Sequence, residues 1–323
     1  MKPVVRALTV LALCLASAPA LAQQTAYPNR VVKIVAASAP GGGTDSVARL
    51  LASHLSQTMG QQFIVENRAG VGNVRGSEYA AKSAPDGYTL LLSASTLSMN
   101  HVMYRKLPYD VARDFAPITQ LVSLPNVLVV APQQPYRTLA DYIAAARADP
   151  GGLTYGSAGM GTQPHLAMEL LQVMTGIKLT HVPYTGVGPA LIDIMGGRVT
   201  SMSVNFLSAK PQIDGGTLRA LAISSAKRSV FAPDIPTIAE SGVPGYEAIQ
   251  WFGLLAPAGT PPEIVARLHA ETRKVLDAPS MRERLALEGA EPIGGTPAEF
   301  AALIKAEMVK WGEVAKAAGI QPE

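Results

Sequence analysis

Apolar, strand-like segments alternate with helical segments along almost the whole chain. In the first third, strand patterns cover 30–38, 61–67 and 87–95, and helical patterns at 46–59 and 78–83 lie between them. Strands separated by helices favour parallel βαβ units, in which helices cover both faces of an open sheet. We therefore predict an α/β fold.

The same alternation restarts near residue 124, which predicts a second α/β unit of similar size. Its strand patterns are 124–132, 153–159, 178–184, 198–206 and 218–225, and its helical patterns are 138–149 and 164–175. The segment 250–276 then has the pattern of strand, turn and helix, and two helices are predicted at 280–289 and 296–319. With 48% hydrophobic residues, a chain of this length can bury a core in each unit.

The first 22 residues have the pattern of a secretory signal peptide. Lys2 and Arg6 give a positive start, Ala7 to Ala16 is apolar, and Ala20-Leu21-Ala22 is a small-x-small cleavage site. The apolar run is too short to span a bilayer. We predict cleavage after Ala22 and a periplasmic mature protein.

The single cysteine, Cys14, lies inside this segment. A lipoprotein would need a small residue immediately before that cysteine, but Leu13 occupies the position. The mature chain is therefore predicted to have no thiol, no disulfide and no cysteine-bound metal.

Charge gives no sign of a polyanionic partner. Without Lys2 and Arg6, 25 of the 27 basic residues remain against 24 acidic ones, and the longest basic run is Lys227-Arg228. Binding to nucleic acid or to an anionic membrane surface normally requires a basic patch. We therefore expect neither kind of partner.

The segment "SAPGGGTDSVARLL" (38–51) carries three consecutive glycines between a predicted strand and a predicted helix. Such a loop presents free backbone N–H groups at the positive end of the helix dipole, a geometry that binds a carboxylate or a phosphate. Thr44 or Asp45 is expected to cap the helix. The Lys-Ser/Thr pair of a nucleotide-binding P-loop is missing. The alternative is an ordinary tight turn before a capped helix.

Two further strand exits are rich in hydrogen-bond donors. "YGSAGMGTQPHL" (155–166) precedes a helix, and "SASTLSMN" (93–100) carries four hydroxyl side chains. In open α/β sheets, ligands bind at the carboxyl ends of the strands, in a crevice between units. We therefore expect the three exits to face one cleft. "GVGNVRG" (70–76) has the wrong spacing for a dinucleotide-binding loop and is interpreted as a plain loop.

Candidates for catalysis are few. His54 and His269 fall in helical stretches, His101 is expected in a loop, and His165 lies just inside a helix, where hydrogen bonding or packing is favoured over a general-base role. No Gly-x-Ser-x-Gly elbow, HExxH motif or metal-ligand spacing is present. We predict a binding protein without cofactor or metal, and not an enzyme.

The stretches "YPNRVVKIV", "APGGGTD", "VENRAG", "APDGYTLLL", "KLPYD", "DFAPIT", "LPNVLVVAP", "YGSAGMGTQPHL", "HVPYTG", "PALIDIMGG", "LRALAISSAKRS", "DIPTIAESGVPGYE", "WFGLLAPAGTP" and "PAEFAALIKAEMVKW" follow one another from Tyr27 to Trp311. Together they closely resemble the Bug family, the periplasmic solute-binding proteins of tripartite tricarboxylate transporters. The resemblance implies a type II periplasmic-binding-protein fold, in which two α/β domains close on a ligand. It places 23–124 and 250–323 in domain 1 and 125–249 in domain 2.

By the same resemblance, the polar loops of both domains hold a carboxylate, partly through water. The implied ligand-binding residues are Ser38, Gly41, Gly42, Gly43, Thr44, Asp45, Ser93, Ser95, Thr96, Ser157, Gly161, Thr162, His165, Val204 and Asn205. The first nine belong to domain 1, and the other six belong to domain 2.

The chain departs from the family pattern at several of these places. Ser38 stands where an aromatic residue is frequent, Val204 where many members have an acid, and Thr185 where lysine is usual. Asn73-Val74 replaces a usual Gly-Asn pair. Because a buried ammonium group needs a carboxylate partner, the missing acid at 204 predicts an amine-free ligand with an apolar or aromatic body against Val204.

The expected function is therefore capture of a small organic carboxylate by a monomeric binding protein that closes like a flytrap. The expected partner is a membrane permease of the tripartite tricarboxylate type. A sensor-kinase ectodomain is the alternative partner. A secreted carboxylate-processing enzyme is the alternative of another class. The signal peptide and the lack of a helix-turn-helix exclude a transcription regulator of the same fold.

Overall fold

The computed structural model describes residues 27–41, 43–287 and 289–322. The order begins with β1 (Val32–Ala36), α2 (Gly43–Met59), β2 (Phe63–Asn67), the 3-10 turn η1 (Val71–Asn73), α3 (Val74–Ala81), β3 (Thr89–Ala94), α4 (Thr96–Met103) and β4 (Phe115–Val130). It continues with α5 (Leu139–Ala148), β5 (Thr154–Ser157), α6 (Gln163–Thr175), β6 (Thr180–Pro183), α7 (Val187–Met195), β7 (Ser201–Asn205), α8 (Phe206–Asp214) and β8 (Arg219–Ile223). It ends with β9 (Ile249–Pro257), α9 (Pro262–Asp277), α10 (Pro279–Leu287), β10 (Glu291–Pro292) and α11 (Pro297–Ala317).

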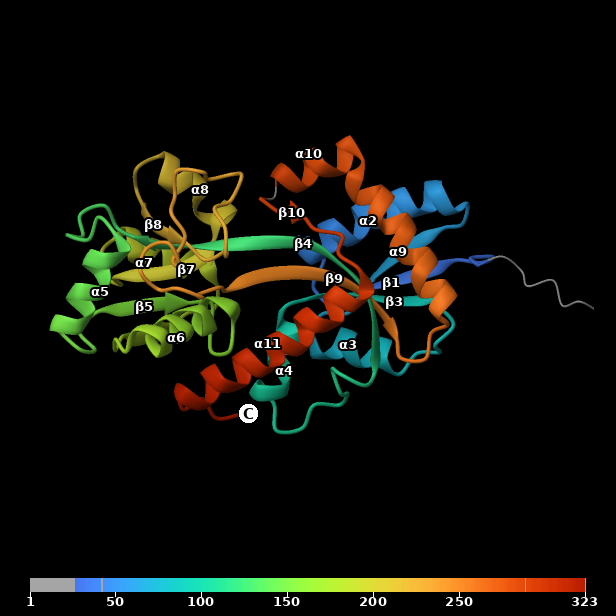
Figure 1. Cartoon of the computed structure of the whole chain (residues 1–323), viewed down its shortest axis with the longest axis horizontal. Coiled ribbons are helices and arrows are strands. Elements are labelled where there is room, and N and C mark those ends of the chain that lie inside the picture. Colours follow the sequence, from blue (N-terminus) through green and yellow to red (C-terminus); the bar gives the residue numbers. More distant parts are fainter. Residues whose placement is uncertain (1–26, 42, 288, 323) are drawn as a thin grey trace, which may run out of the picture.

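The strands form one mixed sheet with the order β2-β1-β3-β9-β4-β7-β5-β6, and β8 and β10 also pair with β4. Figure 1 shows the elements in two groups joined by β4 and β9. We call the group with β1, β2, β3, β9 and β10 the first lobe and the group with β5 to β8 the second lobe. Helices cover both faces of the sheet in each lobe, which confirms the predicted α/β fold.

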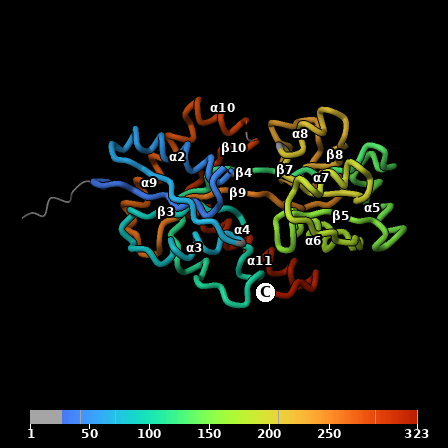
Figure 2. The backbone as a smooth tube through the Cα atoms, turned by 180° about the vertical axis from the view of Figure 1, so that it is seen from behind, coloured from blue at the N-terminus to red at the C-terminus, as the bar shows by residue number. Residues whose placement is uncertain are grey.

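The lobes share strand β4. It runs antiparallel to β9 as far as the pair Pro125–Ile249, and antiparallel to β7 from the pair Asn126–Asn205 onward. Outside this shared strand, β1 is parallel to β2 and β3, and β5 is parallel to β6 and β7. The view from behind shows the same two groups of elements, with β4 and β9 between them (Figure 2).

Helix α11 packs against both lobes. Phe300 near its start lies in the core of the first lobe, whereas Trp311 and Val314 lie in a core cluster with α5 and α6. Its first turn is fixed by a capping box, in which Thr296 Oγ1 accepts from the N–H of Glu299 and the Glu299 carboxylate accepts from the N–H of Thr296. A helix with apolar contacts on two lobes ties them together at one side.

Strand β4 begins at Phe115, nine residues before the predicted start at 124. Pro117 and Pro125 interrupt the strand pattern in the sequence, because proline cannot donate a ladder hydrogen bond. In the structure, the register with β9 shifts between Pro117 and Thr119 and again between Gln120 and Val122. These irregularities accommodate a proline in a long central strand.

Three helices were not predicted: α4, α7 and α8. Gly188, Pro189 and Pro211 weaken the helical pattern of α7 and α8, and α4 is short and rich in polar residues. The expectation that His101 lies in a loop is therefore wrong, since His101 belongs to α4. Packing against α11 stabilises α4, and this contact has no local sequence signal.

Among the described residues, no helix combines the length and the hydropathy needed to cross a bilayer. The signal peptide, the cleavage after Ala22 and Cys14 lie outside the described residues.

Candidate functional site

The glycine-rich loop links β1 to α2. Gly41 has φ 85°, a conformation that favours glycine, and its N–H donates to Asp45 Oδ2 at 2.9 Å. The Asp45 carboxylate also accepts from Arg49 Nε at 3.0 Å and from Asn67 Nδ2 at 2.8 Å. Burial opposes ionisation of Asp45, but these hydrogen bonds lower the pKa of its carboxyl below the ordinary value. Asp45 therefore holds the loop in shape with a charge that is already paired.

The predicted capping role needs correction. Helix α2 begins at Gly43, so Thr44 and Asp45 lie inside its first turn, and both are buried. A side chain at Gly43 would approach the Phe252 ring within 3.3 Å, which explains a glycine where α2 starts beside β9. The prediction for Gly42 lies outside the described residues.

Three predicted hydroxyl groups at the ends of β1 and β3 have no partner among the described residues: Ser38, Ser93 and Ser95. Ser93 and Ser95 are fully buried. The two strands are neighbours in register, with Ala36 opposite Leu92, so their ends lie side by side. An unpartnered buried hydroxyl costs about 1–3 kcal/mol, so the position is set up for an acceptor.

Thr96 opens helix α4 next to these serines. Its Oγ1 accepts from Asn73 Nδ2 at 2.9 Å. Asn73 has φ 63°, a conformation that non-glycine residues rarely adopt, and asparagine tolerates it best. The hydrogen bond therefore ties the loop at η1 to the start of α4.

In the second lobe, the loop after β5 is held by its own polar groups. Thr162 Oγ1 donates to the Gly159 carbonyl at 2.7 Å, and the Gly161 N–H donates to His165 Nδ1 at 3.1 Å. Because Nδ1 accepts this bond, it carries no proton. His165 is 3% exposed, so it supports the loop from beneath.

His165 belongs to an aromatic stack. The ring centroid of His165 lies 4.3 Å from that of His181, and the ring centroid of His181 lies 4.8 Å from that of Tyr155. Burial, and then the neighbouring His181, lower the pKa of His165 to about 4, and burial lowers the pKa of His181. Tyr155 donates to Glu169, and burial raises the pKa of that carboxyl. Both histidines are therefore neutral at pH 7.

The structure reveals a serine–histidine pair that the sequence analysis did not find. Ser157 Oγ lies 2.7 Å from His181 Nε2 and 3.1 Å from the Gly159 nitrogen. The same hydroxyl donates to the Gly159 carbonyl at 3.1 Å, so its hydrogen bonds are made within the protein, unlike those of Ser93 and Ser95. Its geometry fits support of the Gly159–Gly161 loop. The sequence spacing of 24 residues gave no signal of this contact.

The predicted contact at Val204 also needs correction. Val204 is fully buried in β7 and belongs to the core cluster under α7 and α8, with Val127 and Leu191. Side chains alternate along a strand, so its neighbour Ser203 faces the other side and contacts Asn126. Asn205 is half-buried at the end of β7. An apolar ligand body therefore does not meet Val204 in this structure.

A cavity of about 370 Å³ lies between the lobes. Three predicted residues line it: Thr96 from the first lobe, and Gly161 and Thr162 from the second. The other lining residues were missed by the sequence analysis: Gly72, Asn73, Asn100, Met103, Tyr104 and Met160. No sequence signal marked these residues, because the φ of 63° at Asn73 is seen only in the structure.

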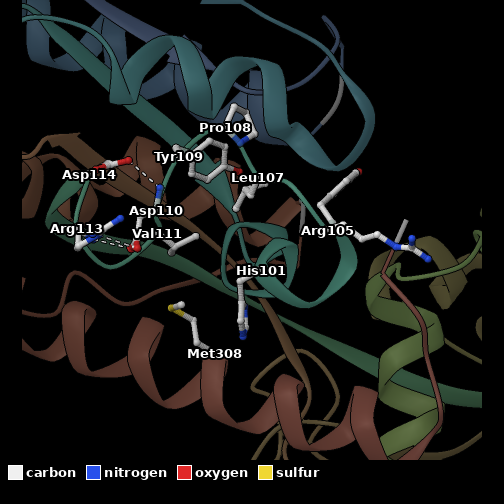
Figure 3. A pocket seen from close by; sticks show the side chains of 11 residues that line it. His101, Arg105, Leu107, Pro108, Tyr109, Asp110, Val111, Arg113, Asp114 and Met308 are labelled. Carbon is white, nitrogen blue, oxygen red and sulfur yellow. Dashed lines mark hydrogen bonds and ion pairs between the residues drawn. The ribbon is translucent and has the colours of Figure 1, made fainter.

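A larger cavity of about 510 Å³ lies between α4, the segment 104–114 and Met308 of α11 (Figure 3). None of the predicted site residues lines it. Its charges are engaged locally, since Arg113 Nε contacts Asp110 Oδ2 at 2.8 Å and Arg105 Nε donates to the Pro322 carbonyl at 3.0 Å. We therefore place the candidate ligand site between the lobes. No group of three or more potential metal ligands occurs among the described residues.

Comparison with known proteins gives consistent matches. Residues 47–320 match the sequence model of the tripartite tricarboxylate transporter family receptor, TctC. Protein BugT of Bordetella pertussis is 38% identical over 318 residues, which cover 97% of this chain and 98% of that protein.

Two solved structures contain a carboxylate. Rpa4515 of R. palustris with adipate is 40% identical and has a TM-score of 0.77, covering 92% of this chain and 100% of that chain. MatC from Rhodopseudomonas palustris with bound malate is 34% identical and has a TM-score of 0.73, covering 89% of this chain and 99% of that chain.

Proposed function

Because this chain belongs to the TctC receptor family of tripartite tricarboxylate transporters, whose members are periplasmic solute-binding proteins, we propose that it captures a small organic carboxylate between its lobes. The cavity lined by Thr96, Gly161 and Thr162 carries this proposal, because residues of both lobes line it and a ligand there would contact both. Relatives with adipate and malate support the ligand class.

The ligand carboxylate is proposed to bind at the ends of β1 and β3. Ser38, Ser93 and Ser95 offer hydroxyl groups without partners among the described residues, and helix α4 begins directly after Ser95, at Thr96. Hydroxyls and helix N-terminal N–H groups together favour an anion. Asp45 contributes loop shape rather than a ligand contact.

Closure of two domains on the ligand is part of the same proposal. We take 23–124 with 250–323 as one domain and 125–249 as the other, since β4 changes partner between Pro125 and Asn126. A ligand that contacts both domains stabilises the closed state by its differential affinity. The closed, monomeric receptor would then deliver the ligand to a permease of the tripartite tricarboxylate type.

We also propose that the ligand has no amine, and the reason is now the lining of the cavity rather than Val204. None of the described residues that line the cavity carries a charge. An ammonium group would therefore lose its hydration without gaining a carboxylate partner, at a cost of several kcal/mol.

Binding without turnover is tested by a thermal-shift screen with mono-, di- and tricarboxylates and amino acids. A ligand at about 100 times its Kd adds roughly 2.7 kcal/mol to stability. Hits that mass spectrometry recovers unchanged after long incubation support a binding protein. Conversion of the ligand would show an enzyme, and a screen without any carboxylate hit would overturn the proposal.

Ser95→Ala tests the location of the carboxylate. The substitution removes a hydroxyl that has no partner in the described part of the chain, so we expect unchanged or higher stability and at least fivefold weaker carboxylate binding. Ser98→Ala is the matched control, because the Ser98 hydroxyl donates to Glu307 at 2.8 Å. The control should lose stability and keep affinity. Unchanged affinity in Ser95→Ala would refute this location while leaving carboxylate binding intact.

A further inference from the structure

The cavity between the lobes has apolar walls on two sides. Met103 reaches it from α4 of the first lobe, and Met160 reaches it from the loop after β5 in the second lobe. Tyr104 adds an aromatic side chain. Methionine is unbranched and polarizable, so it adapts to the shape of an apolar partner.

The Met103 side chain of the first lobe packs closely against Gly161 of the second lobe. A Cβ added at Gly161 would collide with the Met103 side chain, and Gly161 has φ 68°, which favours glycine for a second reason. Met160, on the next position of the loop, is 55% exposed. Met103 thus lies against the loop, and Met160 is exposed at its surface.

The polar groups of the cavity are largely committed to the protein. Asn100 Nδ2 donates to the Gly72 carbonyl and to the Tyr109 hydroxyl, which uses both of its hydrogens. Thr162 donates to Gly159, and Asn73 donates to Thr96. Few donors remain for a second anionic group.

The lack of charged residues around the cavity also argues against a second charged group on the ligand. Among the described lining residues there is no lysine, arginine, aspartate or glutamate. An ammonium group, or a second carboxylate without free hydrogen-bond donors, would be desolvated in such a cavity without compensation. The volume of about 370 Å³ lies within the range of small-molecule sites.

We propose that this cavity holds the uncharged apolar body of a monocarboxylate, aliphatic or aromatic, clasped between Met103 and Met160. The inference rests on the proposed function, in which the single carboxylate binds at Ser38, Ser93 and Ser95, beside Thr96 of the cavity. It excludes tricarboxylates as preferred ligands of this chain and makes Met103 and Met160 its specificity-determining residues. The apolar contact thus comes from these methionines and not from Val204.

Calorimetric titration of the purified protein with three six-carbon acids tests the proposal. Hexanoate has one carboxylate, adipate has two, and 6-aminohexanoate adds an ammonium group to the same chain. We expect hexanoate to bind at least tenfold more tightly than either of the others. Adipate or 6-aminohexanoate binding as tightly as hexanoate would overturn the proposal.

Met160→Lys provides a gain-of-function test, because it places a cation at the cavity. The ratio of adipate affinity to hexanoate affinity should rise at least tenfold. Met174→Lys is the control, since Met174 is 39% exposed at the far end of α6 and does not line this cavity. A ratio that Met160→Lys leaves unchanged would refute the role of Met160.

The outcomes separate the two proposals. If none of these acids binds and no other carboxylate does, the proposed function fails and the inference fails with it. If carboxylates bind without regard to their number of charges, the proposed function stands and only the inference fails.

Discussion

The buried side chain of His165 holds the loop that follows β5. Its Nδ1 accepts from the Gly161 N–H, so the loop depends on the neutral imidazole. The groups around it are His181, Tyr155 and Glu169, whose Oε1 lies 3.8 Å from His165 Nε2. Protonation on Nδ1 would remove the acceptor and place two donors face to face.

The first prediction concerns pH. The pKa of His165 is lowered from 6.5 to about 4 in the folded protein, so between these values the unfolded chain binds more protons. Stability should therefore fall as pH decreases from 6.5 to 4, by about 2–3 kcal/mol from this residue. Urea unfolding at pH 7 and pH 4.5 measures it, and His165→Asn should reduce the difference. An equal pH dependence in the variant would contradict this assignment.

The second prediction concerns Gly161. Gly161→Ala strains the backbone, at roughly 1–2 kcal/mol, and in addition displaces the flexible end of the Met103 side chain. Gly216→Ala is the matched control, because Gly216 has φ 70° with nothing within 4 Å of an added Cβ. Thermal unfolding should show the larger loss for Gly161→Ala, and Met103→Ala should relieve the excess. Equal losses of thermal stability in Gly161→Ala and Gly216→Ala would show that the Met103 side chain moves aside at no cost.

At the scale of elements, Glu307 of α11 joins three segments. Its Oε2 accepts from Ser98 Oγ of α4 at 2.8 Å and from Trp251 Nε1 of β9 at 2.6 Å. Lys310 Nζ lies 3.7 Å from Oε1. Burial raises the pKa of Glu307 above its ordinary value, although Lys310 and the two hydrogen bonds oppose this. This carboxyl fixes α4, and with it Thr96 and Met103, against the strand that connects the lobes.

The third prediction compares two substitutions at this position. Glu307→Leu keeps apolar volume but leaves the Ser98 and Trp251 donors unpaired, so we expect a loss of about 2–5 kcal/mol. Glu307→Gln keeps an acceptor and should cost less than half as much. Because the folded-state pKa is raised, wild-type stability should also decline as pH rises above 4.5, and Glu307→Gln should lack this decline. Denaturant unfolding at several pH values tests both statements.

At the scale of the whole molecule, two lobes meet along a narrow connection. Strands β4 and β9 pass between them, and α11 packs on both (Figure 1). A buried polar group sits at the crossing, where Asn126 of β4 donates to Gln163 at the start of α6, and Gln163 donates to the Ala248 carbonyl at 3.0 Å. The start of α6 directly follows Thr162. The loop after β5 is therefore connected through Gln163 to β4 and to Ala248, which precedes β9.

The fourth prediction follows from this arrangement. If ligand binding closes the lobes, the radius of gyration in solution should decrease when a carboxylate that gave a thermal shift is added. Small-angle X-ray scattering with and without the ligand measures it, and Ser95→Ala at the same ligand concentration provides a matched control with less bound ligand. An unchanged radius at saturation would show that this protein binds without closing.

The sequence by itself determined the alternation of strands and helices, and hence the α/β fold, because period and turn residues are local properties. It also determined the glycine- and hydroxyl-rich exits at 38–45, 93–96 and 157–165, and the family resemblance. The tertiary structure decided which side chains of these exits meet. It buried Val204 in a core, formed α4 by packing on α11, and joined Ser157 to His181 across 24 residues. The face on which a side chain ends depends on contacts between segments distant in sequence, and no local pattern encodes those contacts.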